Sequence, residues 1–312
     1  MSEANFLELY KKMVLIRNLE TSLLQLAEST GEVSDLHLDR GQEAISVGVC
    51  SALRSDDYMV THHRTIAHSI AKGMPLQPLV DEILGRGTGV CGGKANEMHI
   101  RSPEIGYLFS FQLVGTAAPV AAGIAWASRY VKHEDRVVAL FVGDASTSNA
   151  QFLEGMNAAA IRKVPLLVVI ENNHLAGNIT PDYYFPENSG IRDRFNAFGI
   201  ESTSIDGNKI DEVVKSAKAA VDTIRVSSRP VGLICDTTRL LMHKIGQRDV
   251  RKPELVAELA RRDPIAYAER MLGLEERQKK EVREEAESMV AKAISLAHEA
   301  PWPKPDATLL SE

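Results

Sequence analysis

Two apolar runs on either side of a helical segment limit most strongly what this chain can fold into. The runs are residues 137–142 and 164–170, and both are rich in β-branched and aliphatic side chains. Polar residues follow each run at once, Gly143-Asp144 after the first and Glu171-Asn172-Asn173 after the second. Strand, helix and strand in this order form a parallel unit whose ligands bind at the carboxyl ends of the strands. We therefore predict an α/β fold with a doubly wound, mostly parallel sheet flanked by helices.

The polar residues that follow the two runs have the chemistry of a magnesium-diphosphate site. Asp144 offers a carboxylate and Asn173 an amide oxygen, and neighbouring strand ends bring the two side by side. Mg²⁺ prefers such hard oxygen ligands and usually binds carboxylates together with substrate phosphates. Gly143 permits a tight turn, and the start of the next helix offers free N–H groups to a phosphate. The alternative is that Asp144 caps the helix and Asn173 closes a turn.

A second phosphate contact is predicted at the end of another strand. Residues 57–61 have the pattern of a strand, and His62-His63-Arg64 follow it directly. A guanidinium at a strand end can hold a phosphate through two parallel hydrogen bonds. The alternative is that Arg64 forms a salt bridge on the surface.

Composition narrows the class of protein. The chain has 312 residues, 44% of them hydrophobic, and a net charge of −6, which argues against a nucleic-acid-binding surface. No apolar run approaches the length of a membrane span, and the N-terminal residues do not resemble a signal peptide. Three cysteines without a CxxC pair predict a reduced, cytoplasmic protein. We expect one domain over residues 1–312, with an N-terminal helix over residues 1–30 and a helical tail over residues 253–312.

The stretch from residue 137 to residue 180 resembles the thiamine diphosphate motif, in which Gly-Asp-Gly is followed further along by Asn-Asn. More narrowly, the chain resembles the α subunit of the E1 component of 2-oxoacid dehydrogenases, of the pyruvate, branched-chain and acetoin type. The likeness covers residues 35–270 and includes LHLDRGQEAISVGV, HHRTIAHSIAKG, LVGTAAPVAAGIAWA and RRDPIAY. Ala145 departs from it, because the family has glycine there and alanine lacks glycine's freedom at positive φ.

The resemblance implies a cofactor site for thiamine diphosphate and Mg²⁺. The metal ligands would be Asp144, Asn173 and the main-chain carbonyl of Leu175. Main-chain groups near Val114 would contact the aminopyrimidine ring, and Gln112 stands where the family usually has glycine. The complete set of cofactor-binding residues implied is His63, Arg64, Gln112, Val114, Gly143, Asp144, Ala145, Ser146, Asn173 and His243.

Two histidines are expected to be catalytic. His37 precedes Gly-Gln-Glu-Ala, where the family places a histidine close to cofactor and substrate, and His243 aligns with a histidine of the family's active-site loop. The alternatives are a structural role for His37 and an exposed position in a basic loop for His243.

Other positions depart from the family pattern. Ile66 stands where a histidine is common, with His68 two residues later. Ala95-Asn96-Glu97 replaces a run of small residues, and Lys244 replaces a serine that is phosphorylated in regulation. Phosphorylation at residue 244 is therefore excluded.

The resemblance also implies that this chain is half of an active site. In two-chain E1 enzymes a β subunit supplies the glutamate that activates the cofactor, and this chain has no recognisable second half. We expect an α₂β₂ heterotetramer that decarboxylates a 2-oxo acid and passes the acyl group to a lipoyl or other acceptor, with a lipoyl acyltransferase as a further partner. Two alternatives stay open: a thiamine-dependent carboligase subunit that uses an aldehyde acceptor, and a degenerate, non-catalytic partner subunit.

Overall fold

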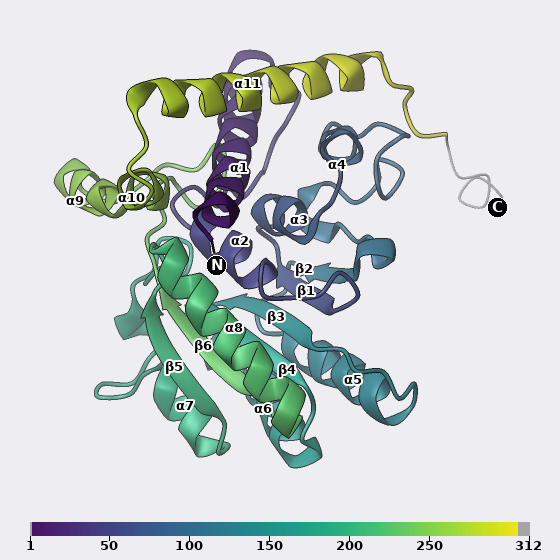
Figure 1. Ribbon diagram of the computed structural model, residues 1–312, viewed down its shortest axis with the longest axis vertical. Coiled ribbons are helices and arrows are strands. Elements are labelled where there is room, and N and C mark those ends of the chain that lie inside the picture. Colours follow the sequence, from purple (N-terminus) through teal and green to yellow (C-terminus); the bar gives the residue numbers. More distant parts are fainter. Residues whose placement is uncertain (1, 305–312) are drawn as a thin grey trace.

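The computed structural model describes residues 2–304, and a six-stranded, all-parallel sheet lies at its centre (Figure 1). The strand order is β2-β1-β3-β4-β6-β5. Helices cover both faces of the sheet, so the predicted doubly wound α/β fold is confirmed. The strands are β1 (Tyr58–His62), β2 (Tyr107–Phe111), β3 (Val138–Gly143), β4 (Leu166–Asn172), β5 (Glu201–Asp206) and β6 (Val231–Asp236).

The two apolar runs form the neighbouring strands β3 and β4 and are buried on both faces. Their side chains alternate between two hydrophobic cores, as the period of a strand requires. Val138 and Leu140 pack into one core, whereas Ala139 and Phe141 pack into the other. A strand buried on both faces needs a continuous apolar run, which explains why the pattern did not alternate with polar residues.

One face of the sheet is covered by α5 (Ala117–Tyr130), α6 (Ala150–Arg162) and α7 (Ile191–Ala197). Helix α5 is rich in small residues, and its buried alanines face the sheet and α6. A side chain at Gly155 of α6 would come within 2.7 Å of the Ala118 backbone, so the two helices approach closely.

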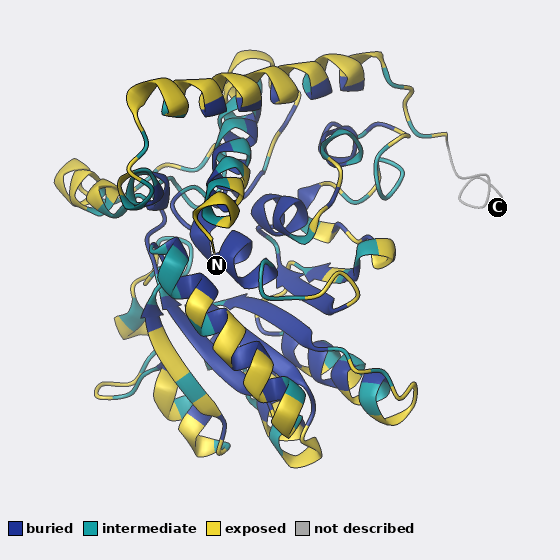
Figure 2. Cartoon of the chain, viewed as in Figure 1, coloured by how far each residue is buried: buried dark blue, intermediate teal, exposed yellow. Residues whose placement is uncertain are grey.

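The other face is covered by α2 (Glu43–Cys50) and α8 (Ile210–Ser227), and α1 (Glu3–Thr30) packs on α2 (Figure 1). Further helices are α3 (Ile66–Lys72), α4 (Leu76–Ile83), α9 (Pro253–Leu259) and α10 (Pro264–Met271). The last helix, α11 (Glu276–Glu299), lies across α1 and α4 with a buried stripe inward and a polar face outward (Figure 2). Residues 305–312 of the expected tail, and residue 1, lie outside the described part.

The chain after β3 differs from the sequence-based prediction. A 3₁₀ turn, η3 (Asp144–Ser148), comes first, and α6 begins only at Ala150. Asn149 is the N-cap, since its side-chain oxygen accepts a hydrogen bond from the Gln151 N–H at 2.8 Å. The alternative that Asp144 caps this helix is therefore wrong. Ala145 does not adopt positive φ, so the missing glycine causes no backbone strain here.

Strand β2 was not predicted. It lies at one edge of the sheet, and β5, which exposes several polar side chains, lies at the other. Within residues 2–304, the helices lack the combination of length and apolar character needed to cross a bilayer.

Candidate active site

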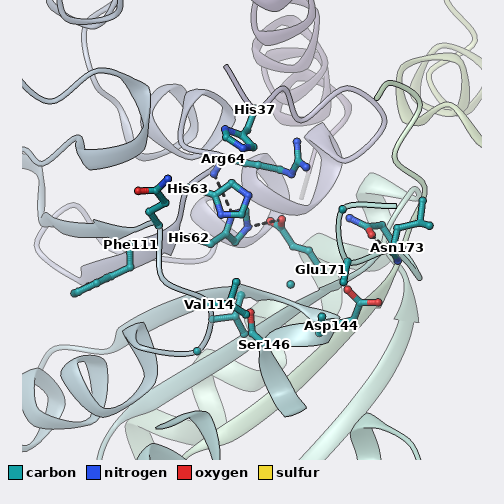
Figure 3. Close-up of a pocket in the computed structure, with 18 of the residues that line it drawn as sticks. His37, His62, His63, Arg64, Phe111, Val114, Asp144, Ser146, Glu171 and Asn173 are labelled. Carbon is teal, nitrogen blue, oxygen red and sulfur yellow. Dashed lines mark hydrogen bonds and ion pairs between the residues drawn. The ribbon is translucent and has the colours of Figure 1, made fainter. Parts of the chain in front are cut away.

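A cavity of about 330 Å³ opens at the carboxyl ends of β1, β3 and β4 (Figure 3). The chain passes from β1 outward to β2 and then back across β1 to β3, so the cavity lies at the point where the strand order reverses. The structure brings all the sequence-predicted site residues together around it. They are His37, His63, Arg64, Gln112, Val114, Gly143, Asp144, Ala145, Ser146, Asn173, Leu175 and His243.

The oxygen donors lie on one side of the cavity, just after β3 and just after β4. Asp144 is buried, and the Tyr184 hydroxyl donates to its Oδ2 at 2.6 Å. Burial raises the pKa of Asp144, and the Tyr184 hydrogen bond opposes this rise. Asn173 Oδ1 accepts a hydrogen bond from the Leu175 N–H at 3.0 Å, so Asn173 does close a turn, yet it still lines the cavity. A carboxylate, an amide oxygen and a main-chain carbonyl are the donor set that suits Mg²⁺.

Two guanidinium groups line the same cavity. Arg64 is buried and donates to the main-chain carbonyls of Leu38 at 2.7 Å and His243 at 3.0 Å. None of the ion pairs found within residues 2–304 includes Arg64, so the alternative of a surface salt bridge is wrong. Burial lowers the pKa of Arg64, and burial also lowers that of Arg239, to about 9. Buried cations without a carboxylate partner favour an anionic ligand such as a phosphate.

Three histidine rings stand together at the cavity. The ring centroid of His37 lies 4.5 Å from that of His63 and 5.0 Å from that of His243. Burial and the Arg64 charge lower the pKa of His243 to about 3 and that of His63 still further, so both rings are neutral. The Nε2 atom of His63 is buried and has no hydrogen-bond partner.

Arg64 fixes the tautomers of two histidines. Its NH2 group donates to His243 Nδ1 at 2.9 Å, and its main-chain N–H donates to His62 Nδ1 at 3.1 Å. In both rings the proton must therefore reside on Nε2. The groups His37–His63–His243 and His62–His68–Glu171 are close enough to hold a metal ion. We interpret the first group as a cluster of ring contacts, because Arg64 donates to the Nδ1 atom of His243. We interpret the second as a hydrogen-bond network, because Glu171 accepts from both histidines.

Glu171 is a cavity residue to which sequence reasoning gave no role. It pairs with Gly143 in the sheet, and its carboxylate accepts from His62 Nε2 at 2.8 Å and from His68 Nε2 at 2.9 Å. Burial raises the pKa of Glu171, but the two histidines outweigh it and hold the pKa well below its usual range. The signal was present in the sequence, because a carboxylate directly after a buried apolar run needs a partner.

His68 does not line the cavity. Its Nδ1 donates to the Arg64 carbonyl at 2.7 Å while its Nε2 faces Glu171. Burial lowers the pKa of His68, but Glu171 and Asp39 raise it above its usual value. His68 therefore serves as the counter-ion of Glu171 and does not take the place of a histidine at residue 66.

Glu171→Gln is expected to lower the free energy of unfolding at pH 7 by about 3 kcal/mol, because it removes one partner of a buried ion pair. Because the folded-state pKa of Glu171 is depressed, its contribution is complete above the unfolded-state pKa and is lost as the pH falls. The difference from the wild type should therefore shrink below about pH 4. Urea unfolding at several pH values measures this.

The matched control is Glu201→Gln, at an exposed position of edge strand β5 in the same sheet. It should change the free energy of unfolding by no more than about 0.5 kcal/mol. Equal effects of the two substitutions would contradict the ion-pair account.

Comparisons with known proteins fit this geometry. The model of the family "Dehydrogenase E1 component" matches residues 11–306. The α subunit of acetoin:2,6-dichlorophenolindophenol oxidoreductase from Bacillus subtilis (strain 168) is 32% identical over 316 residues, covering 100% of this chain and 94% of that protein. The chloroplastic pyruvate dehydrogenase E1 component subunit alpha-3 of Arabidopsis thaliana is 32% identical, covering 95% of this chain and 72% of that protein. The pyruvate dehydrogenase E1 component subunit alpha of Zymomonas mobilis is 31% identical, covering 95% and 85%.

Proposed function

The chain belongs to the dehydrogenase E1 component family as an α-type subunit of an oxidoreductase, and from this premise we propose that it binds thiamine diphosphate and Mg²⁺ at the cavity. With a β subunit, it would decarboxylate a 2-oxo acid and pass the acyl group to a lipoyl or other acceptor. A carboligase is not favoured, because these relatives are named as dehydrogenase and oxidoreductase subunits.

One observation carries this proposal. The buried guanidinium groups of Arg64 and Arg239 line the same cavity as the oxygen donors Asp144 and Asn173. A diphosphate with Mg²⁺ would suit both sets of groups. The guanidinium groups would bind its oxygens, and the carboxylate would bind the metal ion. A degenerate, non-catalytic partner subunit would have no need to keep both the buried guanidinium groups and the oxygen donors.

Each part of the cavity would have its own task. The carbonyl of Leu175 would complete the metal ligands, and the turn that contains Ala145 and Ser146 would lie beside the diphosphate. The main chain at Val114 and the side chain of Gln112 would face the aminopyrimidine. When bound, thiamine diphosphate supplies the electron sink for decarboxylation. The protein contributes binding and orientation, and the imidazole rings of His37 and His243 accept or donate protons near the reacting atoms.

An exposed apolar surface beside the cavity supports the β-subunit proposal. Leu113 and Val114 line the cavity and are exposed, and Leu113 retains 71% of its accessible surface. Phe109 is exposed on the edge strand β2. Trp126 and Tyr130 are exposed on α5. Exposed apolar groups of this kind mark protein contact sites. We propose an α₂β₂ heterotetramer in which the β subunit covers this surface and supplies the activating glutamate.

Three further proposals concern a partner, the domain organisation and the location of the protein. A lipoyl acyltransferase is a further partner, and the chain acts as one domain over residues 1–312 with helical extensions at both ends. The three cysteines are free thiols, which fits a reducing compartment, and the cytoplasm is the location that we propose.

The acceptor of the acyl group or electrons distinguishes the proposed dehydrogenase reaction from a carboligase reaction. The complex with the β subunit should oxidise pyruvate, a branched-chain 2-oxo acid or acetoin when 2,6-dichlorophenolindophenol or a lipoyl domain accepts the product. Dye bleaching and mass spectrometry of the acylated lipoyl domain measure this. A complex that only joins the acyl group to an added aldehyde, and neither bleaches the dye nor acylates the domain, would contradict the dehydrogenase assignment.

A further inference from the structure

A buried glutamate lies behind His37, in the segment where the chain departs from its family. Glu97 begins the turn η1 (Glu97–His99) and is fully buried. Its Oε1 accepts two hydrogen bonds from His37, one from the main-chain N–H at 2.9 Å and one from Nδ1 at 3.1 Å. Asn96 Oδ1 accepts from the Glu97 N–H at 2.6 Å, and the Thr65 hydroxyl donates to the Glu97 carbonyl. The last two contacts hold the main chain of Glu97, and the carboxylate is directed at His37 through Oε1, whereas its Oε2 is buried without a hydrogen-bond partner among the described residues.

This contact decides which nitrogen of His37 carries the proton. Because Oε1 already accepts from the main-chain N–H, it acts as an acceptor toward the ring as well, and Nδ1 must be the protonated nitrogen. The other nitrogen, Nε2, then has a free lone pair. His37 lines the cavity beside His63 and His243 (Figure 3), so this lone pair is available there.

His243 is held in the opposite tautomer. Arg64 NH2 donates to its Nδ1 at 2.9 Å, and the proton of the neutral ring is therefore on Nε2. The cavity thus contains two neighbouring imidazoles with opposite hydrogen-bonding roles. His37 offers an acceptor, and His243 offers a donor.

We propose that Glu97 is a positioning residue, which fixes His37 in the tautomer with a free Nε2 and so makes His37 the acceptor and His243 the donor of the site. This inference rests on the proposed function, because the reacting molecule is taken to be a 2-oxo acid in this cavity. The competing explanation is that Glu97 only anchors its loop to the main chain of His37. The two explanations differ in their effect on the tautomer and on kcat.

Three variants distinguish the positioning role of Glu97 from a purely anchoring role. Glu97→Ala removes the acceptor, so the His37 ring should lose its Nδ1–H preference. In the αβ complex kcat should fall about 100-fold or more, with the KM for the oxo acid and the cofactor affinity little changed. Glu97→Gln keeps an acceptor oxygen in the same place and should restore both the tautomer and most of kcat. Thr65→Val removes the other loop anchor without touching His37 and should leave kcat and the tautomer unchanged.

The tautomer is measured by ¹⁵N NMR on the full chain labelled with [¹⁵N]histidine, with the His37 signal assigned by its loss in His37→Gln. This readout needs no turnover, so it stands even if the wild-type complex decarboxylates no 2-oxo acid, a result that would refute only the proposed function. Glu97→Ala with an unchanged tautomer or an unchanged kcat would overturn the inference. So would a Glu97→Gln variant that keeps the tautomer and still loses activity.

Discussion

Purified by itself, the chain is expected to show no measurable decarboxylation of a 2-oxo acid, and addition of its β subunit is expected to produce activity. The reason lies in the carboxylates of the cavity. Among the residues that line it, the only carboxylates are Asp144 and Glu171. Asp144 accepts from Tyr184 and is the proposed metal ligand, and Glu171 is paired with two histidines. No cavity carboxylate of this chain is left to activate the aminopyrimidine.

Release of ¹⁴CO₂ from a labelled 2-oxo acid, measured for the chain alone and for the co-expressed pair, checks this prediction. The pair should elute as a heterotetramer and bind one thiamine diphosphate for each αβ unit. A useful control is a β subunit whose activating glutamate is changed to glutamine, which should assemble but remain inactive. Robust turnover by the isolated α-type chain would overturn the half-site account.

Asp144→Ala is expected to abolish Mg²⁺-dependent binding of thiamine diphosphate to the αβ complex. Asp144 is the only carboxylate of the oxygen donor set, and without it the ion that bridges protein and diphosphate loses its charged ligand. Calorimetric titration of the cofactor into wild-type and variant complexes measures the effect.

The matched control for this substitution is Asp222→Ala. Asp222 lies on α8, where it pairs with Lys218 on the exposed surface, so cofactor affinity should stay at the wild-type value. Equal affinity in the Asp144→Ala and wild-type complexes would remove Asp144 from the metal site. A variant complex that no longer assembles is recognised by gel filtration, and Asp144→Asn, which keeps the shape of the side chain, then takes its place.

The parts of this protein that could be predicted from sequence are those set by local patterns. Buried strands such as β3 and β4 are recognisable in the sequence as apolar runs. Polar residues at their carboxyl ends must lie close together, because neighbouring parallel strands end at the same edge of the sheet. The edge strand β2 was missed because its apolar stretch, YLFSF, has only five residues, and a short apolar run does not distinguish a strand from a buried helical segment.

The missed parts of the site depend on contacts between distant segments. Glu97 lies 60 residues from His37, and Glu171 lies 109 residues from His62, so no local pattern links either pair. The tautomer of His243 depends in the same way on Arg64, 179 residues away. The family resemblance assigned the histidines to the site, but only the fold reveals which of their nitrogens carries a proton.

The central claim is that this cavity binds the Mg-diphosphate end of thiamine diphosphate. The most direct measurement is calorimetric titration of the αβ complex with thiamine diphosphate and, in parallel, with thiamine, each in Mg²⁺ and in EDTA. The account predicts saturable binding of thiamine diphosphate in Mg²⁺ only and no detectable binding of thiamine. Equal binding of thiamine and thiamine diphosphate, or binding that does not change when Mg²⁺ is removed, would contradict it.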